Sequence, residues 1–269
     1  MSTSYRTFFG MKKEAFAGDL SLKEIFETDD IRSVQERFDY AIRLGAVALV
    51  TGEIGSGKST ALRYVAAKLH PSEYRAVHIT ACSGSILEFY RLFLAELNID
   101  KSSTSRAVMI RLIKKEIKEL VLGKKLKVVL IVDEASLMRL EVFAELHTIT
   151  QFEQDSKPWL PIILAGKTSL IDVLTYQTSM PLASRIVARS HLEPANRTQM
   201  EAYLTHHLSI IGLNSNLFDE AATTAIHQGS GGLFRKANNL ARGALIAAAS
   251  DQSMTVTAEH VRLASTEVF

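Results

Sequence analysis

One short segment of the chain has residue types and spacing suited to holding a chain of phosphates. Residues 52–60 read GEIGSGKST, which is the pattern Gly-x4-Gly-Lys-Ser. The glycines keep bulky side chains out of the loop, so successive backbone N–H groups can surround an anion. Lys58 would reach the β- and γ-phosphates of ATP, and the Ser59 hydroxyl would bind Mg²⁺. The predicted nucleotide-binding residues are Gly52, Glu53, Ile54, Gly55, Ser56, Gly57, Lys58, Ser59 and Thr60.

The segments on either side of this loop fit the strand and helix that such a site requires. Apolar residues 46–51 precede the loop, and an apolar helical pattern follows it over residues 60–69. The alternative is a glycine-rich helix cap without a ligand. A cap does not need Lys58 and Ser59 after its last glycine, so the pattern favours nucleotide binding.

A second candidate site ends the apolar segment KVVLIVDEA, residues 127–135. Near-continuous β-branched residues are typical of a strand buried on both faces of a parallel sheet. Asp133, at the end of that strand, would support the Mg²⁺ held by Ser59. Glu134 would polarise a water for in-line attack on the γ-phosphate. The alternative is a carboxylate pair that caps the next helix.

ATP hydrolysis also requires positive charge near the transition state. Arg185 and Arg189 lie in LASRIVAR, between the expected fourth and fifth strands, and Arg235 begins a later helix in SGGLFRKANNL. A single arginine is most often a solvated surface charge. The position of these three relative to the strands makes them candidates for catalysis or nucleotide binding.

Strand and helix patterns alternate up to residue 194 and are purely helical afterwards. The expected strands besides 46–51 and 127–133 are residues 75–80, 160–166 and 191–194, with helices at 30–44, 86–99 and 105–122. Four helical patterns follow Arg197, and we interpret His206 and His207 as helix surface. We therefore expect an α/β domain over residues 1–195, including an aromatic segment at 1–28, and a helical domain over 196–269.

The composition indicates the cellular compartment in which the protein would occur. The chain has 269 residues, a net charge of +2 and a single cysteine, Cys82, so an intrachain disulfide is impossible. The N-terminus lacks the apolar core of a signal peptide, and no apolar run approaches the roughly 20 residues that span a bilayer. These features predict a soluble cytoplasmic protein without a membrane partner.

The charge is unevenly distributed along the chain. Residues 101–127 contain nine Lys or Arg against two Glu, which makes this segment +7 and the remainder −5. The helix expected at 105–122 places its cations opposite its apolar stripe, which suits either a phosphate track or an ordinary solvated face. Any DNA binding would be largely independent of sequence, because no base-reading motif is present. The candidate DNA-binding residues are Lys101, Arg106, Arg111, Lys114, Lys115 and Lys167.

In order and residue type these motifs resemble those of AAA+ ATPases. More narrowly, they resemble the branch shared by general secretion pathway protein A and the Mu B-like and TniB-like target-selection ATPases of mobile elements. The resemblance covers essentially the full length. It has two departures: Ala15 stands where that branch usually has proline, and Lys167 lies in the region of sensor 1, where a neutral polar residue is usual. The matching segments are FFGMKKEAF, LVTGEIGSGKST, VVLIVDEASLM, IILAGKTSL, LASRI and SGGLFRKANNL.

The resemblance implies a P-loop AAA+ domain with a five-stranded parallel sheet, followed by a small all-α lid domain. It also implies a homo-oligomer, either a ring or a filament. Arg185 would be the arginine finger that acts on a neighbouring subunit, and Arg235 the sensor-2 arginine of the lid. Lys167 would either serve as sensor 1 or contact phosphate or DNA instead.

Two functions fit this resemblance. The first is an ATPase that assembles on duplex DNA and recruits or activates a transposase. The alternative is a secretion-pathway ATPase that drives assembly of an envelope complex, a class that usually continues into a membrane span and a cell-wall-binding domain. Because the sequence ends at Phe269 with neither, we expect the DNA role. A third reading, a nucleotide-dependent scaffold with little turnover, is disfavoured by Glu134.

Overall fold

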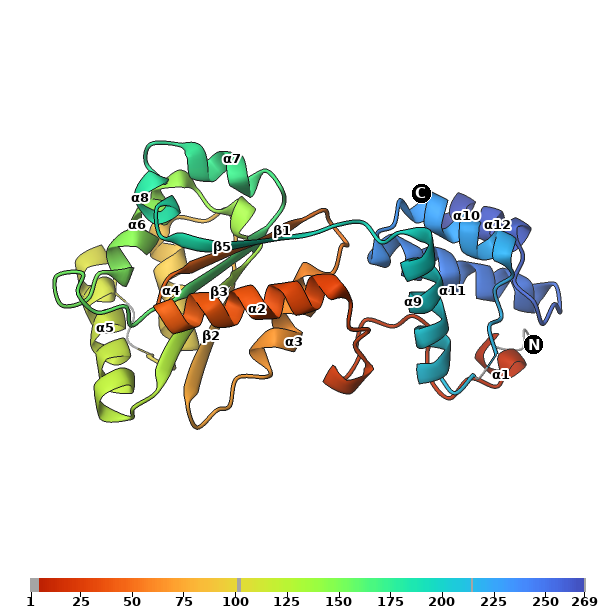
Figure 1. Ribbon diagram of the computed structural model, residues 1–269, viewed down its shortest axis with the longest axis horizontal. Coiled ribbons are helices and arrows are strands. Elements are labelled where there is room, and N and C mark those ends of the chain that lie inside the picture. The colour runs from red at the N-terminus through yellow and green to blue at the C-terminus, as the bar shows by residue number, and fades with distance from the viewer. Residues whose placement is uncertain (1–4, 101–102, 214, 269) are drawn as a thin grey trace. The chain divides into compact units, whose positions relative to one another are not determined.

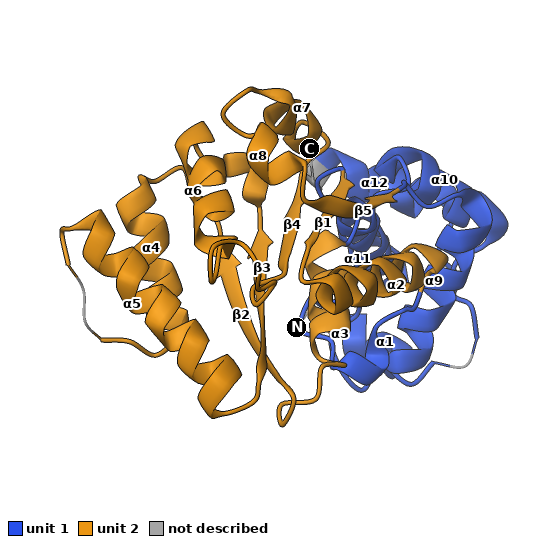
Figure 2. Cartoon of the chain, turned by 60° about the vertical axis from the view of Figure 1, so that its left-hand side comes forward, with its two compact units in different colours: residues 1–27, 53–57, 193–269 blue, residues 28–52, 58–192 orange. Residues whose placement is uncertain are grey.

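The computed structural model describes residues 5–100, 103–213 and 215–268. These residues form two compact units, shown in different colours in Figure 2. The sheet unit comprises residues 28–52 and 58–192. The helical unit comprises the described residues of 1–27, 53–57 and 193–269.

The sheet unit is built on five parallel strands in the order β2-β3-β4-β1-β5. This confirms the predicted α/β fold with a five-stranded parallel sheet (Figure 1). In β3 and β4 every residue except Lys127 is buried, as expected for strands covered on both faces. The strands are β1 (Val47–Gly52), β2 (Tyr74–Thr80), β3 (Lys127–Asp133), β4 (Ile162–Gly166) and β5 (Ile186–Leu192).

Helices cover both faces of this sheet, with α2 and α3 on one side and α4, α5 and α6 on the other (Figures 1 and 2). Thr28 caps α2, its side chain accepting a hydrogen bond from the N–H of Ile31 at 3.2 Å. The helices are α2 (Asp29–Leu44), α3 (Lys58–Ala66), α4 (Ile86–Glu96), α5 (Arg106–Lys118), α6 (Leu140–Thr150), α7 (Leu170–Thr175) and α8 (Met180–Ala183), with a π-helical turn at Glu119–Gly123 and a 3₁₀ turn at Ala135–Leu137.

The fifth strand differs from the prediction. We expected it at residues 191–194, but β5 runs over Ile186–Leu192. It lies at an edge of the sheet beside β1, and its residues alternate between more and less exposed positions. A half-exposed edge strand carries no continuous apolar run, so the pattern that identified the central strands was missing here.

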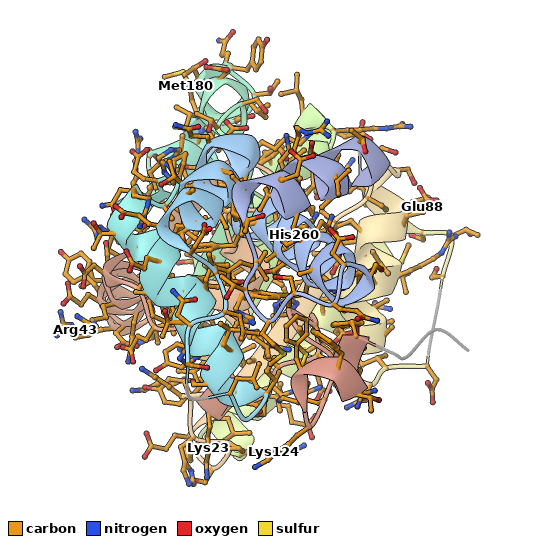
Figure 3. The ribbon with its side chains drawn as sticks, turned by 90° about the vertical axis from the view of Figure 1, so that its right-hand side faces the viewer. Lys23, Arg43, Glu88, Lys124, Met180 and His260 are labelled. Atoms are coloured by element: carbon orange, nitrogen blue, oxygen red, sulfur yellow. The ribbon has the colours of Figure 1, made fainter. Side chains whose placement is uncertain are left out.

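The helical unit contains the four predicted C-terminal helices. Its core is rich in alanine, and α11 alone contributes Ala237, Ala241, Ala244 and Ala248. His260 of α12, labelled in Figure 3, is buried. Its Nδ1 accepts a hydrogen bond from the N–H of Thr257 at 3.0 Å. The unit consists of α1 (Tyr5–Phe9), a 3₁₀ turn at Leu22–Glu24, α9 (Arg197–Ile210), α10 (Glu220–Ser230), α11 (Phe234–Ser250) and α12 (Ala258–Val268).

Residues 5–27 of the N-terminal aromatic segment belong to the helical unit, whereas we expected residues 1–28 to accompany the α/β domain. The Phe16 ring stacks on His207 with centroids 5.2 Å apart, and the Arg242 Nε donates to the Ala15 carbonyl at 3.1 Å. The interpretation of His207 as helix surface is therefore wrong, since its exposed fraction is only 2%. Helical periodicity does not reveal which distant segment covers a given face.

No helix in the described part of the chain is long and apolar enough to cross a membrane.

Candidate active site

The glycine-rich loop connects β1 directly to α3. Gly55 and Gly57 have φ angles of +89° and +100°, which L-residues with side chains rarely adopt. Lys58 begins α3 with only 6% of its surface exposed, and its Nζ donates to the Gly52 carbonyl at 2.9 Å. The loop therefore places a buried ammonium group beside its own backbone, where a phosphate could bind.

Ser56 gives a structural test of whether the loop fits a phosphate. Its side chain is buried, and its Oγ has no hydrogen-bond partner among the described residues. A buried hydroxyl without a partner costs about 1–3 kcal/mol, which a ligand that accepts its hydrogen bond would offset. The residues present therefore fit a phosphate group.

Gly55 also permits a close backbone approach within the helical unit. Its carbonyl accepts a hydrogen bond from the N–H of Arg235 at 3.2 Å. A Cβ atom at Gly55 would lie 3.0 Å from the Cβ of Arg235. The Arg235 side chain itself is exposed, and its sensor-2 role stays a prediction.

The acidic pair lies at the same edge of the sheet as the start of the loop. Thr51 of β1 is in register with Gly166 of β4, and β4 pairs in turn with β3, which ends at Asp133. Asp133 is 5% exposed, and its Oδ1 accepts a hydrogen bond from the N–H of Glu134 at 2.8 Å. Because the strands are parallel, their carboxyl ends bring these residues to one edge, as ligand sites of α/β sheets require.

Glu134 has an unusual backbone conformation. Its φ and ψ of +53° and +32° are left-handed, which costs about 1–2 kcal/mol for a residue with a side chain. The 3₁₀ turn begins directly afterwards, so the backbone leaves the line of β3 at this residue. The Glu134 side chain therefore does not continue the alternation of side chains between the two faces of the sheet. It is half-buried, whereas Asp133 is buried.

Lys167, in the predicted sensor-1 region, follows β4 directly and is half-buried. Its backbone N–H donates to the Ser136 Oγ at 3.3 Å. The preceding Gly166 approaches the same turn so closely that a Cβ there would lie 2.9 Å from the Ser136 nitrogen. This residue therefore stands at the sheet edge that also carries Asp133, rather than on the basic helix α5.

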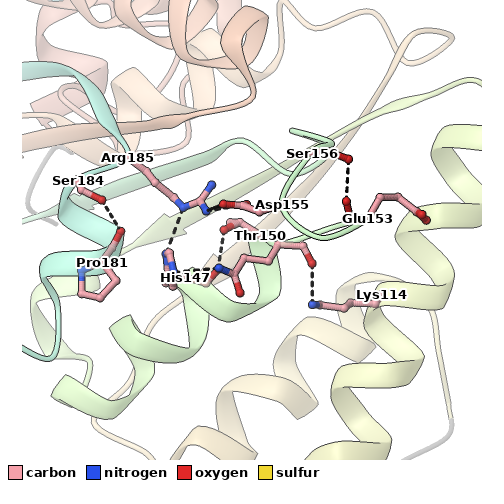
Figure 4. Close-up of polar contacts among 10 residues, drawn as sticks. Lys114, His147, Thr150, Glu153, Asp155, Ser156, Pro181, Ser184 and Arg185 are labelled. Carbon is pink, nitrogen blue, oxygen red and sulfur yellow. Dashed lines mark hydrogen bonds and ion pairs between the residues drawn. The ribbon is translucent and has the colours of Figure 1, made fainter.

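Of the two arginines expected between the fourth and fifth strands, only Arg185 precedes β5. It lies between α8 and β5, where its guanidinium contacts Asp155 and His147 (Figure 4). Arg189 is instead a residue of β5, exposed and in register with Leu49 of β1. The placement of Arg189 between two strands was therefore wrong, because the fifth strand begins earlier than predicted.

Sequence patterns did not identify His147 and Asp155. They lie 38 and 30 residues before Arg185, and no local motif links either of them to it.

Several cations of the basic segment bind partners within the chain. Arg106 forms an ion pair with the buried Glu145 of α6. Lys114 donates to the Gln151 carbonyl at 2.9 Å, and burial lowers its pKa. These two residues are thus not part of a plain solvated face.

The rest of α5 presents a more open basic surface. Lys118 pairs with Glu153 at 2.7 Å, whereas Arg111 and Lys115 are exposed. A groove of about 670 Å³ lies between α5 and residues 151–153. The remaining DNA-binding candidate of this segment, Lys101, lies outside the described residues.

The AAA domain profile matches residues 42–174. General secretion pathway protein A of Aeromonas hydrophila is 28% identical over 267 residues, which are 98% of this chain and 48% of that protein. The chain thus spans about half the length of this curated relative.

Solved structures with low sequence identity share the fold. Cdc6p from Pyrobaculum aerophilum matches with a TM-score of 0.75 and 17% identity, over 94% of this chain and 70% of its own. The Aeropyrum pernix ORC1 protein in complex with DNA matches at 0.71 and 16%, over 94% and 68%. The Thermotoga maritima RuvB Holliday junction branch migration motor matches at 0.58 and 17%, over 97% and 73%. With the strand order described above, these likenesses show that the chain has the fold of the P-loop AAA+ ATPases.

Proposed function

We propose that this protein binds ATP with Mg²⁺ and hydrolyses it to ADP and phosphate. The observation that carries the proposal is that the buried Lys58, which contacts the Gly52 carbonyl at the end of β1, and the carboxylates of Asp133 and Glu134 lie at one edge of the sheet. Mg²⁺, bound by Ser59 and Asp133, would neutralise part of the negative charge on the phosphates. The AAA+ fold and the AAA domain at residues 42–174 support this activity.

Each residue has a separate task in this proposal. Lys58 orients the β- and γ-phosphates, while the backbone N–H groups of the loop hold them in place. Glu134 accepts a proton from the attacking water, and its half-exposed position gives water access to it. Arg235, at the start of α11, adds positive charge to the bound nucleotide, as the resemblance implies.

Glu134→Gln tests the catalytic assignment. Removing the base while keeping the shape should lower turnover by about 100-fold or more and leave ATP affinity within about twofold. Phosphate release and equilibrium nucleotide binding would be measured on both proteins. Hydrolysis by Glu134→Gln at the wild-type rate would contradict the assignment.

The protein acts as an oligomer in this proposal, with Arg185 as a finger for a neighbouring subunit. The support is the resemblance of LASRI to the finger segment and the position of Arg185 outside the glycine-rich loop. Turnover per subunit should then rise with protein concentration, because a complete site forms only between subunits. Turnover per subunit that stays constant over the range in which assembly occurs would contradict it.

Two cellular roles are candidates for this ATPase, and a role in the general secretion pathway has more direct support than a DNA-associated role. The relative that carries this name matches 98% of the present chain at 28% identity. In this role, ATP binding and hydrolysis drive assembly of an envelope complex. The test is whether loss of the gene product impairs secretion and whether the Glu134→Gln variant fails to restore it.

The second candidate is a DNA-associated regulator that recruits or activates a transposase. Arg111 and Lys115 favour it, because both are exposed on α5 within the segment of charge +7. The ORC1 structure of the same fold contains DNA, which is consistent with this role. Since Arg106 and Lys114 already contact partners within the chain, each subunit offers few phosphate contacts and would need aligned neighbours.

Salt dependence of DNA binding distinguishes the two candidates. In the DNA-associated role, protein loaded with a non-hydrolysable ATP analogue binds arbitrary duplex DNA, and log affinity falls by about 0.9 per phosphate contact for each unit of log salt. Arg111→Ala with Lys115→Ala should flatten this slope without changing ATP affinity. No DNA binding at low salt would eliminate the second candidate and leave the secretion role.

A further inference from the structure

The loop at residues 152–157 has a costly conformation that presents one carboxylate to Arg185. Three consecutive residues, Glu153, Gln154 and Asp155, have φ angles of +46°, +59° and +65°. Left-handed conformations are unfavourable in residues with side chains and persist only where other contacts enforce them. A bridge between Phe152 and Lys157 closes the loop. Such a loop fixes the direction of the Asp155 carboxylate.

Two side chains hold the Arg185 guanidinium from different directions (Figure 4). Its Nη2 lies 2.6 Å from both carboxylate oxygens of Asp155, and its Nε donates to the His147 Nδ1 at 3.1 Å. These contacts keep the pKa of Asp155 below its ordinary value, because the hydrogen-bonded guanidinium stabilises the carboxylate. The guanidinium is therefore oriented by groups from α6 and from the loop that follows it.

The hydrogen bond from the Arg185 Nε–H determines which protonation state His147 can have. An arginine Nε–H can only donate, so the His147 Nδ1 must carry a lone pair, while the side-chain amide of Gln151 lies 3.2 Å from Nε2. Burial, and then the positive charge of Arg185, lower the pKa of His147. The imidazole is thus a neutral acceptor for Arg185.

The second terminal nitrogen of the Arg185 guanidinium, Nη1, is available for a further contact. The Nη1 of Arg185 has no hydrogen-bond partner among the described residues, and the side chain remains 26% exposed. We propose that Asp155 and His147 are positioning residues that hold Arg185 with its Nη1 directed outward, so that it can contact the γ-phosphate of ATP in a neighbouring subunit. This inference rests on the proposed role of Arg185 as a finger acting between subunits.

The physical gain comes from orienting the arginine in advance. A free arginine side chain populates many rotamers, and it loses this freedom on contacting a phosphate. Contacts at Nε and Nη2 remove much of that freedom before the subunits meet. They should therefore raise the turnover number and leave the affinity for ATP unchanged.

Asp155→Asn and Glu153→Gln form a matched pair for the test. Both replace a carboxylate of the same loop by its amide, and the two acids are similarly exposed, at 44% and 46%. Glu153 pairs with Lys118 instead of Arg185. Asp155→Asn should lower the turnover number about tenfold with the Michaelis constant for ATP unchanged, whereas Glu153→Gln should stay within about twofold of wild type.

Mixing subunits gives a readout that loop destabilisation alone would not change. Asp155→Asn subunits have an intact nucleotide loop, and Lys58→Ala subunits have an intact Arg185 with both positioning residues. Adding Lys58→Ala subunits should raise the turnover per Asp155→Asn subunit, because some of these loops then meet a wild-type finger. If the defect lay in the nucleotide site of the mutated subunit itself, the mixture would show no gain, which would overturn the inference.

The variants also separate this inference from the proposal on which it rests. Arg185→Ala with Arg189→Ala as control tests the finger: equal turnover in the two variants would remove the finger role itself. If Arg185→Ala inactivates the protein but Asp155→Asn matches wild type, only the positioning inference fails. Faster turnover by Asp155→Asn would overturn it too, since Asp155 would then restrain the finger. His147→Asn, which keeps an acceptor, should retain more activity than His147→Leu.

Discussion

The sheet unit and the helical unit form their cores in different ways. In the sheet unit, contiguous buried apolar residues such as 128–132 fill both faces of the sheet, and the candidate catalytic residues follow directly at the strand ends. In the helical unit, small alanines allow α11 to pack closely, and Phe16 stacks on His207, which is 191 positions further along the chain. Short sequence patterns therefore describe the first unit well, whereas the second depends on contacts between distant segments.

The largest expected effect concerns Lys58, whose role follows from local sequence. Lys58→Ala should weaken ATP binding by about 1,000-fold, since two charge-assisted contacts of about 2 kcal/mol each would be lost. Titration calorimetry would measure the affinity, with Lys68→Ala as a control on an exposed lysine ten residues away. ATP binding by Lys58→Ala at wild-type affinity would break the link between motif and function in this unit.

His207 tests the long-range core of the helical unit. Burial lowers the pKa of His207 from 6.5 to about 4, so between these pH values the unfolded chain binds a proton that the folded chain does not. Stability should therefore be full above pH 6.5 and fall by about 3 kcal/mol as the pH drops to 4.

Denaturant unfolding at several pH values would measure this loss. His207→Phe should remove that part of the pH dependence, whereas His70→Gln, at an exposed histidine, should retain it. Identical pH profiles for wild type and His207→Phe would show that the contact with Phe16 does not bury this histidine in solution.

A smaller effect is expected at Thr28, where a local capping interaction begins the sheet unit. Thr28→Ala removes the acceptor for the Ile31 N–H and should destabilise the protein by about 1 kcal/mol. Ser33→Ala, inside the same helix, is the control. Thermal unfolding of both variants would be compared with wild type, and equal midpoints would show that the cap adds no stability.

The smallest expected effect is partial recovery in mixtures of inactive variants. In an equimolar mixture of Arg185→Ala and Lys58→Ala subunits, about one site in four combines an intact loop with an intact finger, so about a quarter of wild-type turnover should return. Phosphate release at a fixed total concentration would measure it. If no turnover returns at any mixing ratio, although assembly is verified, Arg185 acts within its own subunit.

Much of the sheet and of the candidate active site could be predicted from sequence because the relevant interactions are local. The left-handed glycines of the loop, its lysine and the strand before it lie within about a dozen residues, and parallel strand ends bring Asp133 to the same edge. The bounds of the fifth strand were harder to predict, because an edge strand whose residues alternate in exposure has a weak hydrophobic pattern. Because the strand was predicted to begin at residue 191 and begins at Ile186, Arg189 was predicted to lie before the strand and lies within it.

The sequence by itself thus determined the α/β class and predicted the glycine-rich loop and the acidic pair, because each of these follows from a pattern of neighbouring residues. Only the tertiary structure decided that His207 is buried, that Arg106 and Lys114 are engaged within the chain, and that Asp155 and His147 hold Arg185. These contacts join residues between 30 and 191 positions apart. At such separations many pairings suit the same local pattern, and the packing of the whole unit selects one of them.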